Sequence, residues 1–122
     1  MQLTEHKPQN YNHIRRVDDE GIVIGDQRYT GSLLVGAHLL ETDWPLSSLA
    51  DLDKERLTPI WKLSPELVLI GIGDRQQIAP IELQRAFLER HIGLECMTLQ
   101  AACRTFNVLM SENRRALALL IQ

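Results

Sequence analysis

Two closely spaced glycines raise the question of a phosphate-binding site. Gly71 and Gly73 lie at the end of the apolar run Val68–Ile72, which is typical of a strand buried on both faces. Dinucleotide-binding folds hold a pyrophosphate with a glycine turn between such a strand and a helix, on the free N–H groups of the helix N-terminus. The turn from Gly71 to Arg75 is therefore the first candidate for a small-molecule or anion site.

The spacing around this turn departs from that of a dinucleotide-binding fingerprint. The third glycine would fall at Gln76, and the next helix is predicted to start at Pro80, seven residues after Gly73. Asp74 adds a negative charge where an anion would lie. We therefore predict that the glycines serve the backbone, and that at least one has a positive φ or a neighbour too close for a Cβ atom. Anion or small-molecule binding, or an unrecognised enzyme activity, is the alternative for this turn and the start of the last helix.

Charged and polar residues near the carboxyl ends of two predicted strands form a second candidate. Asp74, Arg75 and Gln100 occupy the segments that leave these strands. If the strands are neighbours, the three residues line one shallow cleft together with Arg104. Neither hydroxyl side chain of the last predicted helix has a histidine near it in sequence, so we assign no catalytic residue.

The cysteines and histidines do not form a metal-binding pattern. Cys96 and Cys103 lie seven residues apart, which matches neither a zinc knuckle nor a redox CxxC motif. The four histidines are scattered, without an HxH or HxxxH grouping. We expect both cysteines to be core thiols and Cys103 to be inert, and we expect no metal and no cofactor.

The last predicted helix, 99–113, has an apolar side and a second face that suits a partner. Its apolar stripe is predicted to pack on the sheet, and Arg104 points away from it, flanked by Ala101 and Val108. An arginine offers a partner helix both a planar donor group and an apolar stem. The alternative is that the chain's own N-terminal layer covers this face and that Arg104 pairs with an Asp or Glu. Asn107, at the flank of the stripe, is expected to bond neighbouring backbone groups at a loop.

The elements that position these residues follow from hydrophobic periodicity and turn signals. The N-terminal part is predicted to form short antiparallel strands, two of them in a hairpin closed by Gly25-Asp26. Strands and helices alternate in the C-terminal half, which indicates an α/β layer arrangement. The predicted strands are 14–17, 21–24, 27–29, 32–37, 68–72, 94–98 and 116–121, and the predicted helices run from Pro80 to before Gly93 and over 99–113.

Helix starts are marked by potential capping residues. Ser48 and Asp53 are candidate N-caps in segment 41–67, which is rich in turn and helix formers. Pro59 argues that the helix of this segment begins there or is irregular before it. Thr98 is the predicted N-cap of the last helix.

Length, composition and charge indicate one globular domain. The chain has 122 residues, of which 44% are hydrophobic and 24% charged, with a formal net charge of −3. Positive and negative side chains are interspersed, so we expect no nucleic-acid partner. The apolar runs are shorter than a membrane span and the first residues do not resemble a signal peptide, so we expect no membrane insertion and a cytoplasmic location. Residues 1–12 are predicted to be a poorly ordered arm, and 13–122 a single α/β domain.

The order of segments resembles a small α/β family that includes the mitochondrial respiratory complex I assembly factor 3 and many uncharacterised bacterial proteins of about this length. The resemblance covers nearly the whole chain. It is carried by the Gly71-Ile72-Gly73 turn, the helix ending at His91-Ile92-Gly93, the strand 94–98, the segment 101–109, the ending Glu112-Asn113-Arg114-Arg115 and the weaker stretch from Leu34 to Trp44-Pro45.

The resemblance implies both a fold and a mode of action. The implied fold has three layers, with a central mixed sheet, helices on its faces and an additional antiparallel β layer from the N-terminal part. No catalytic residue or cofactor is carried over, and the mitochondrial relative acts through protein contacts during assembly of a membrane complex. We therefore expect a non-catalytic domain that binds another protein or self-associates.

Overall fold

The computed structural model describes residues 10–122 of the chain. Residues 1–9 of the predicted arm lie outside the described residues. At the end of that arm, Asn12 donates a backbone hydrogen bond to Ala37 O (2.8 Å), and its side chain donates to Gly36 O and Leu39 O (2.9 Å each). These bonds attach the start of the domain to a turn of the central sheet.

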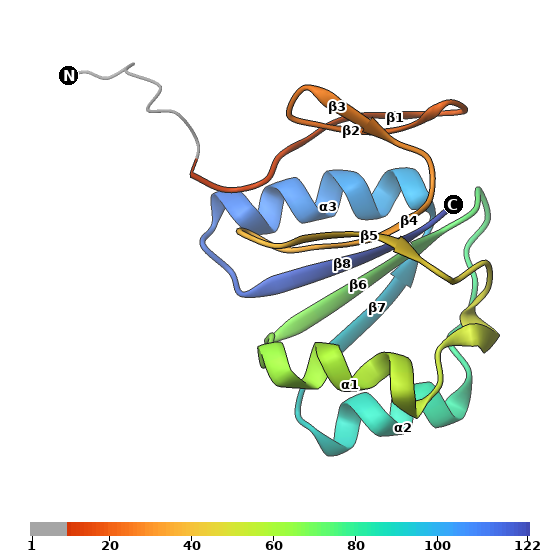
Figure 1. Cartoon of the computed structure of the whole chain (residues 1–122). Helices are drawn as coiled ribbons and strands as arrows, with labels where there is room; N and C mark the ends of the chain where they lie inside the picture. Colours follow the sequence, from red (N-terminus) through yellow and green to blue (C-terminus); the bar gives the residue numbers. More distant parts are fainter. Residues whose placement is uncertain (1–9) are drawn as a thin grey trace.

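A five-stranded mixed sheet forms the centre of the molecule (Figure 1). The two neighbours of β6 run parallel to it, whereas β4 is antiparallel to both β8 and β5. In spatial order the strands are β5 (Leu40–Trp44), β4 (Ser32–Val35), β8 (Ala116–Ile121), β6 (Leu67–Ile72) and β7 (Gly93–Met97). The carboxyl ends of the three parallel strands therefore meet at one edge of the sheet.

The N-terminal part forms a separate three-stranded antiparallel sheet from β1 (Ile14–Asp18), β2 (Gly21–Ile24) and β3 (Gln27–Tyr29). The predicted hairpin at Gly25-Asp26 is confirmed, since Ile24 pairs with Gln27 and Gly25 has a φ of 61°. Helix α3 (Leu99–Ser111) lies between this sheet and the central one (Figure 1). The predicted α/β fold, with a central mixed sheet and an additional N-terminal β layer, is thus confirmed.

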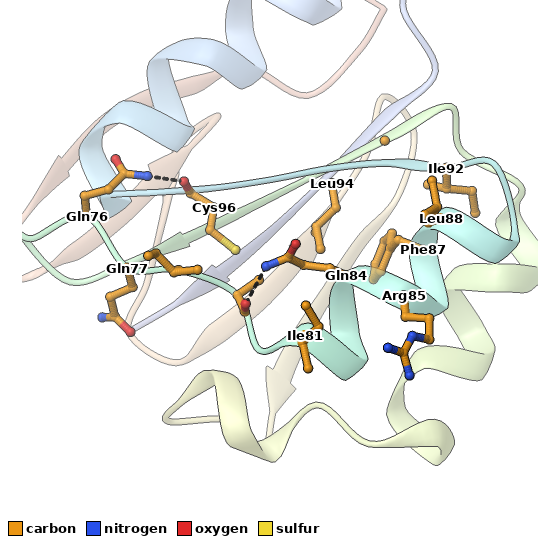
Figure 2. Close-up of a pocket in the computed structure, with 13 residues that line it drawn as sticks. Gln76, Gln77, Ile81, Gln84, Arg85, Phe87, Leu88, Ile92, Leu94 and Cys96 are labelled. Carbon is orange, nitrogen blue, oxygen red and sulfur yellow. Dashed lines mark hydrogen bonds between the residues drawn. The ribbon is translucent and has the colours of Figure 1, made fainter.

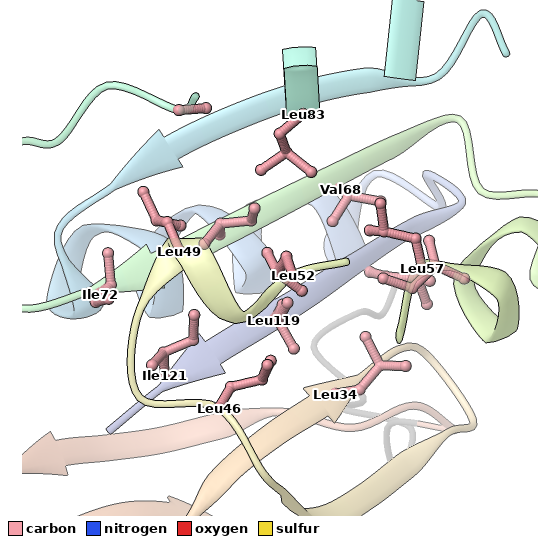
Figure 3. Packing of buried hydrophobic residues seen from close by; sticks show 14 of the residues in the cluster. Leu34, Leu46, Leu49, Leu52, Leu57, Val68, Ile72, Leu83, Leu119 and Ile121 are labelled. Atoms are coloured by element: carbon pink, nitrogen blue, oxygen red, sulfur yellow. The ribbon is translucent and has the colours of Figure 1, made fainter. Parts of the chain in front are cut away.

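The other face of the central sheet is covered by α1 (Lys54–Leu63), α2 (Ile81–Glu89) and the short 3₁₀ helix η1 (Leu49–Asp51). Alternate residues of β6 point into two separate cores, with Val68 and Ile70 toward α1 and α2 and Leu69 toward α3. This two-sided burial is the reason for the continuous apolar runs of β6 and β8. Figure 3 shows the first core, in which Val68, Leu119 and Leu34 of the sheet pack against Leu49, Leu52, Leu57 and Leu83.

The predicted caps determine where two helices begin. Asp53 Oδ1 accepts the Arg56 N–H at 3.0 Å, and Thr98 Oγ1 accepts the Ala101 N–H at 3.2 Å. Helix α1 therefore begins at Lys54 rather than at Pro59, which lies inside it. The proline is tolerated because it lies on the exposed side of the helix, where water can solvate a carbonyl that lacks its usual donor.

Strand β5 was not predicted, since segment 41–67 is rich in turn and helix formers. Its three central residues are exposed, and Asp43 has a left-handed φ of 61°. Only Leu40 and Trp44, at its ends, are half-buried. Pairing with β4, rather than a local preference, makes this segment a strand.

Gly71 controls how closely α3 approaches the sheet. A Cβ atom there would lie 2.5 Å from Ala102 Cβ and 3.2 Å from Leu120 Cδ2. We expect Gly71→Ala to lower the free energy of unfolding by about 1–3 kcal/mol, because α3 must move to relieve the overlap. Urea unfolding monitored by circular dichroism measures this change.

Gly25→Ala is the matched control. Unlike Gly71, Gly25 has a positive φ, and nothing lies within 4 Å of its added Cβ, so this variant reports the cost of a left-handed backbone without any steric overlap, about 1 kcal/mol. If Gly71→Ala costs no more than Gly25→Ala, the close approach of α3 does not depend on the missing side chain.

Candidate functional site

The glycine turn is occupied by contacts within the chain. Gly73 has a φ of 65°, and Gly71 is buried against Ala102, so the predicted conformational role of the glycines is confirmed. The Gly73 carbonyl accepts the Leu99 N–H at 2.9 Å, and the Thr98 hydroxyl accepts the Ala101 N–H. Two of the N–H groups that an anion would contact at the start of α3 are therefore already bonded.

A hollow of about 710 Å³ lies at the carboxyl edge of the parallel strands. It brings together three of the predicted residues, Gly73, Asp74 and Gln100, because β6 and β7 are neighbours as the prediction required. The last residue of β1, Asp18, and the first residue of the following turn, Asp19, also line it. Of the described residues that line the hollow, three carry carboxylates and none is a lysine or arginine, which disfavours an anion there.

Asp18 stays ionised at this edge. Its carboxylate accepts the Glu20 N–H at 2.9 Å and the Arg28 Nη1–H at 2.7 Å. The backbone hydrogen bond from Glu20, followed by the Arg28 guanidinium, holds the pKa of Asp18 below its usual value. Asp18 is therefore a carboxylate at neutral pH, and its charge is paired with that of Arg28.

The other predicted residues lie elsewhere. Arg75 is exposed and does not line the hollow, and Arg104 lies on the exposed side of α3. Asn107 joins two layers, since its Nδ2 donates to Ile14 O (2.8 Å) and its Oδ1 accepts the Ile14 N–H (2.9 Å). Asn107 thus satisfies backbone groups as predicted, although these belong to β1 and not to a loop.

The outer side of α3 is only partly covered by the N-terminal sheet. Val108 is 54% exposed and Ala101 is half-buried. Arg104 forms no ion pair with any residue in the range 10–122. The face considered for a partner is therefore partly open, and Val108 is its one strongly exposed apolar residue among those described.

Both cysteines pack with the core, Cys103 buried and Cys96 half-buried. Burial raises the pKa of the Cys103 thiol to about 12, and the nearby Arg104 charge offsets only part of this effect. Burial also raises the pKa of Cys96. Within residues 10–122, no group of three or more His, Cys, Asp or Glu side chains is arranged to hold a metal ion.

An apolar groove between α2 and β7 was missed by the sequence analysis (Figure 2). Its volume is about 620 Å³, and Arg85 is the only charged residue that lines it in the described part of the chain. Three of its apolar side chains are strongly exposed: Ile78 (85%), Ile81 (64%) and Leu88 (75%). The remaining lining residues are Gln76, Gln77, Ala79, Gln84, Phe87, Ile92, Gly93, Leu94 and Cys96.

One signal in the sequence could have revealed this groove. Leu83 and Phe87 already provide α2 with an apolar face, and both are buried. Ile81 and Leu88, seven residues apart, fall on a different side of the same helix, where this chain does not cover them. A nine-residue helix with apolar residues on two sides indicates a second contact surface.

Among the helices of residues 10–122, none has the length and apolar character needed to cross a bilayer.

The buried thiol gives a direct test of the core packing. In a Cys96→Ala variant, the remaining Cys103 should not react with Ellman's reagent at pH 8 until the protein is unfolded. With a pKa of about 12, on the order of one thiol in ten thousand is ionised at that pH, and the sulfur is also shielded from the reagent. Reaction of the native variant at the rate of a free thiol would contradict this assignment.

Three proteins are similar to this chain, and one of them has a solved structure. A "13 kDa major membrane protein" of Francisella tularensis is 26% identical, covering 99% of this chain and 99% of that protein. Human "NADH dehydrogenase (ubiquinone) 1 alpha subcomplex assembly factor 3" is 28% identical over 99% of this chain. The chain spans 66% of the length of that human relative. The NMR structure of a Xanthomonas campestris protein superposes with a TM-score of 0.82 at 35% identity, covering 99% of this chain and 92% of that one.

A family model matches nearly all of the described residues. A family model described as "Protein of unknown function (DUF498/DUF598)" matches residues 14–121, from the first residue of β1 to the last of β8. The resemblance to the family of the complex I assembly factor is thereby confirmed. The chain belongs to the DUF498/DUF598 family.

Proposed function

We propose that this domain is a non-catalytic protein-binding module that contacts its partner through the groove between α2 and β7. The observation that carries this proposal is the exposure of Ile78, Ile81 and Leu88 around one apolar hollow. Burying such a side chain completely is worth about 1.5–3 kcal/mol, so a partner that covers all three gains substantial binding free energy. Apolar side chains gathered around a groove are typical of protein contact sites.

The relatives support contact with proteins as the mode of action. The human relative is named as an assembly factor of NADH dehydrogenase, and assembly proceeds through contacts between proteins. We extend to this chain only the general role of binding a protein during assembly, or of self-association. The mixed charges, with a net charge of −3, support a protein rather than a nucleic-acid partner.

The carboxyl-edge hollow is the weaker candidate site. Asp18, Asp19 and Asp74 disfavour an anion there, and Gly73 already accepts the first N–H of α3. The predicted partner face at Arg104 is smaller than the groove, since Val108 is its only strongly exposed apolar residue. We therefore assign the contact to the groove and use the α3 face as the reference surface.

A single added charge should separate the two surfaces. Leu88→Lys places an ammonium group in the groove, and because Leu88 is exposed the fold should tolerate it. Val108→Lys makes the same change of charge on α3, at a residue that is also exposed. With wild-type and variant proteins as bait in native lysate, we expect a stoichiometric partner to be captured by the wild type and by Val108→Lys, and reduced at least about tenfold by Leu88→Lys.

Other outcomes would contradict the assignment. Loss of the partner with Val108→Lys or Arg104→Glu, and not with Leu88→Lys, would move the contact to α3. The absence of both a stoichiometric partner and self-association in sedimentation experiments at cellular concentration would remove the protein-binding role itself.

A cytoplasmic location is a separate part of the proposal. The name of the Francisella relative refers to a membrane, so location needs its own measurement. We expect cell fractionation to recover the domain with the soluble proteins. Recovery in the membrane fraction after a high-salt wash would contradict a cytoplasmic location without affecting the assignment of the groove.

A further inference from the structure

The groove is bordered by the free edge of the central sheet. Among residues 10–122, β7 is the last strand of the sheet, with β6 on one side and no strand on the other. Leu94 and Cys96 of this strand line the groove, and Figure 2 shows them opposite α2. A partner lying in the groove therefore contacts the main chain of β7 as well as apolar side chains.

The parallel ladder determines which main-chain groups of β7 point outward. The Gly93 N–H donates to Glu66 O at 2.9 Å, so Gly93 and every second residue after it bond to β6. The N–H and C=O groups of Leu94 and Cys96 therefore face away from the sheet. Among residues 10–122, only one of these four groups has a partner, since Gln76 Nε2 donates to Cys96 O at 2.8 Å.

The opposite edge of the sheet lacks such an opening. β5 carries the exposed acidic residues Glu41 and Asp43, and its register with β4 is interrupted by an irregularity. A backbone with a positive φ at Asp43 also departs from a regular strand. Charges and irregularities of this kind discourage the addition of another strand, whereas β7 has only Glu95 as a charged residue.

We propose that an extended segment of the partner protein adds to β7 as a parallel strand, with apolar side chains at alternate positions in the groove and a carboxylate beside Arg85. This inference deepens the proposed function and depends on it, because it names how the same groove is filled. Main-chain hydrogen bonds to a sheet edge supply affinity in this binding mode, and pockets for alternate side chains supply specificity.

The parallel direction follows from the three free groups. One residue of a parallel guest strand can donate its N–H to Leu94 O and accept the Cys96 N–H, and the carbonyl two residues earlier can accept the Leu94 N–H. This pattern leaves Cys96 O to Gln76 when the guest strand ends at the following residue, because an N–H two residues further along would point at that carbonyl. An antiparallel guest strand would direct an N–H at the same carbonyl and compete with Gln76.

The charges around the groove argue for a separate partner over a second copy of this chain. Two copies of β7 paired around a two-fold axis at Glu95 would place two glutamates directly opposite each other, which is unfavourable. Arg85 is the only charged residue that lines the groove, and it forms no ion pair within residues 10–122. A guest segment with an acidic residue complements this charge.

Selection from a phage library of random nine-residue peptides, with the full chain as target, tests the proposal. We expect selected peptides with apolar residues at alternate positions and one Asp or Glu. Their binding should be lost with Leu88→Lys and retained with Val108→Lys. Arg85→Glu should weaken binding about two- to fivefold, and exchanging the peptide's acidic residue for lysine should restore it.

N-methylation of a selected peptide, one residue at a time, tests the main-chain contacts. Methylation of the N–H that donates to Leu94 O should weaken binding at least about tenfold, whereas methylation of the two adjacent residues should change it little. In amide hydrogen exchange, the Leu94 and Cys96 N–H groups should become protected when the peptide binds. NOEs between peptide and β7 report the direction of the guest strand.

The outcomes separate this inference from the proposed function. Peptides with a helical i, i+3, i+4 pattern, or binding that is insensitive to N-methylation, would overturn strand addition while leaving the groove as the contact site. NOEs of an antiparallel pair would overturn the parallel direction. A failure to select any peptide, or selection of peptides that Leu88→Lys still binds, would overturn both the inference and the groove assignment. A dimer of the free chain that Leu88→Lys dissociates would overturn the separate partner and leave the groove as the contact site.

Discussion

The arrangement of the layers depends on the close approach of α3 to β6 at Gly71. Because Gly71 has no side chain, Ala102 packs directly on the strand, and α3 lies near enough for Leu99 to bond to Gly73 O. The helix then presents Phe106 to the core on its sheet side. Asn107, on the same helix, holds Ile14 of the N-terminal sheet. One missing side chain thus allows a single helix to join two sheets.

This packing also decides what the carboxyl edge of the parallel strands can do. In many α/β folds, a helix N-terminus with free N–H groups faces a ligand at this edge. Here the chain's own carbonyl and hydroxyl accept two of those N–H groups, and aspartates line the adjacent hollow. The glycine turn looks like a cofactor site in the sequence, yet its contacts are those of an architectural turn.

The two edges of the central sheet differ from each other. The β5 end is irregular and acidic, whereas the β7 end has free main-chain groups beside exposed apolar side chains. Those side chains would be unfavourable in a molecule that used neither edge. The proposed role in binding proteins would account for their presence, and the human relative is named as an assembly factor.

The sequence by itself determined the features that depend on near neighbours along the chain. Asp53 and Thr98 are recognisable as caps, because a cap bonds an N–H only two or three residues away. The apolar run of β6 indicates burial on both faces, and the Gly25-Asp26 turn indicates a hairpin.

Only the tertiary structure decided that residues 40–44 form a strand. It also decided that Asp18 and Asp19 join Asp74 and Gln100 at one edge of the sheet, and that Arg75 and Arg104 do not. It also decided that β7 has no outer neighbour and that Ile81 and Leu88 stay uncovered. Strand order and the exposure of a helix face depend on contacts between segments far apart in the chain, and the periodicity of one segment carries no information about which other segment will cover it.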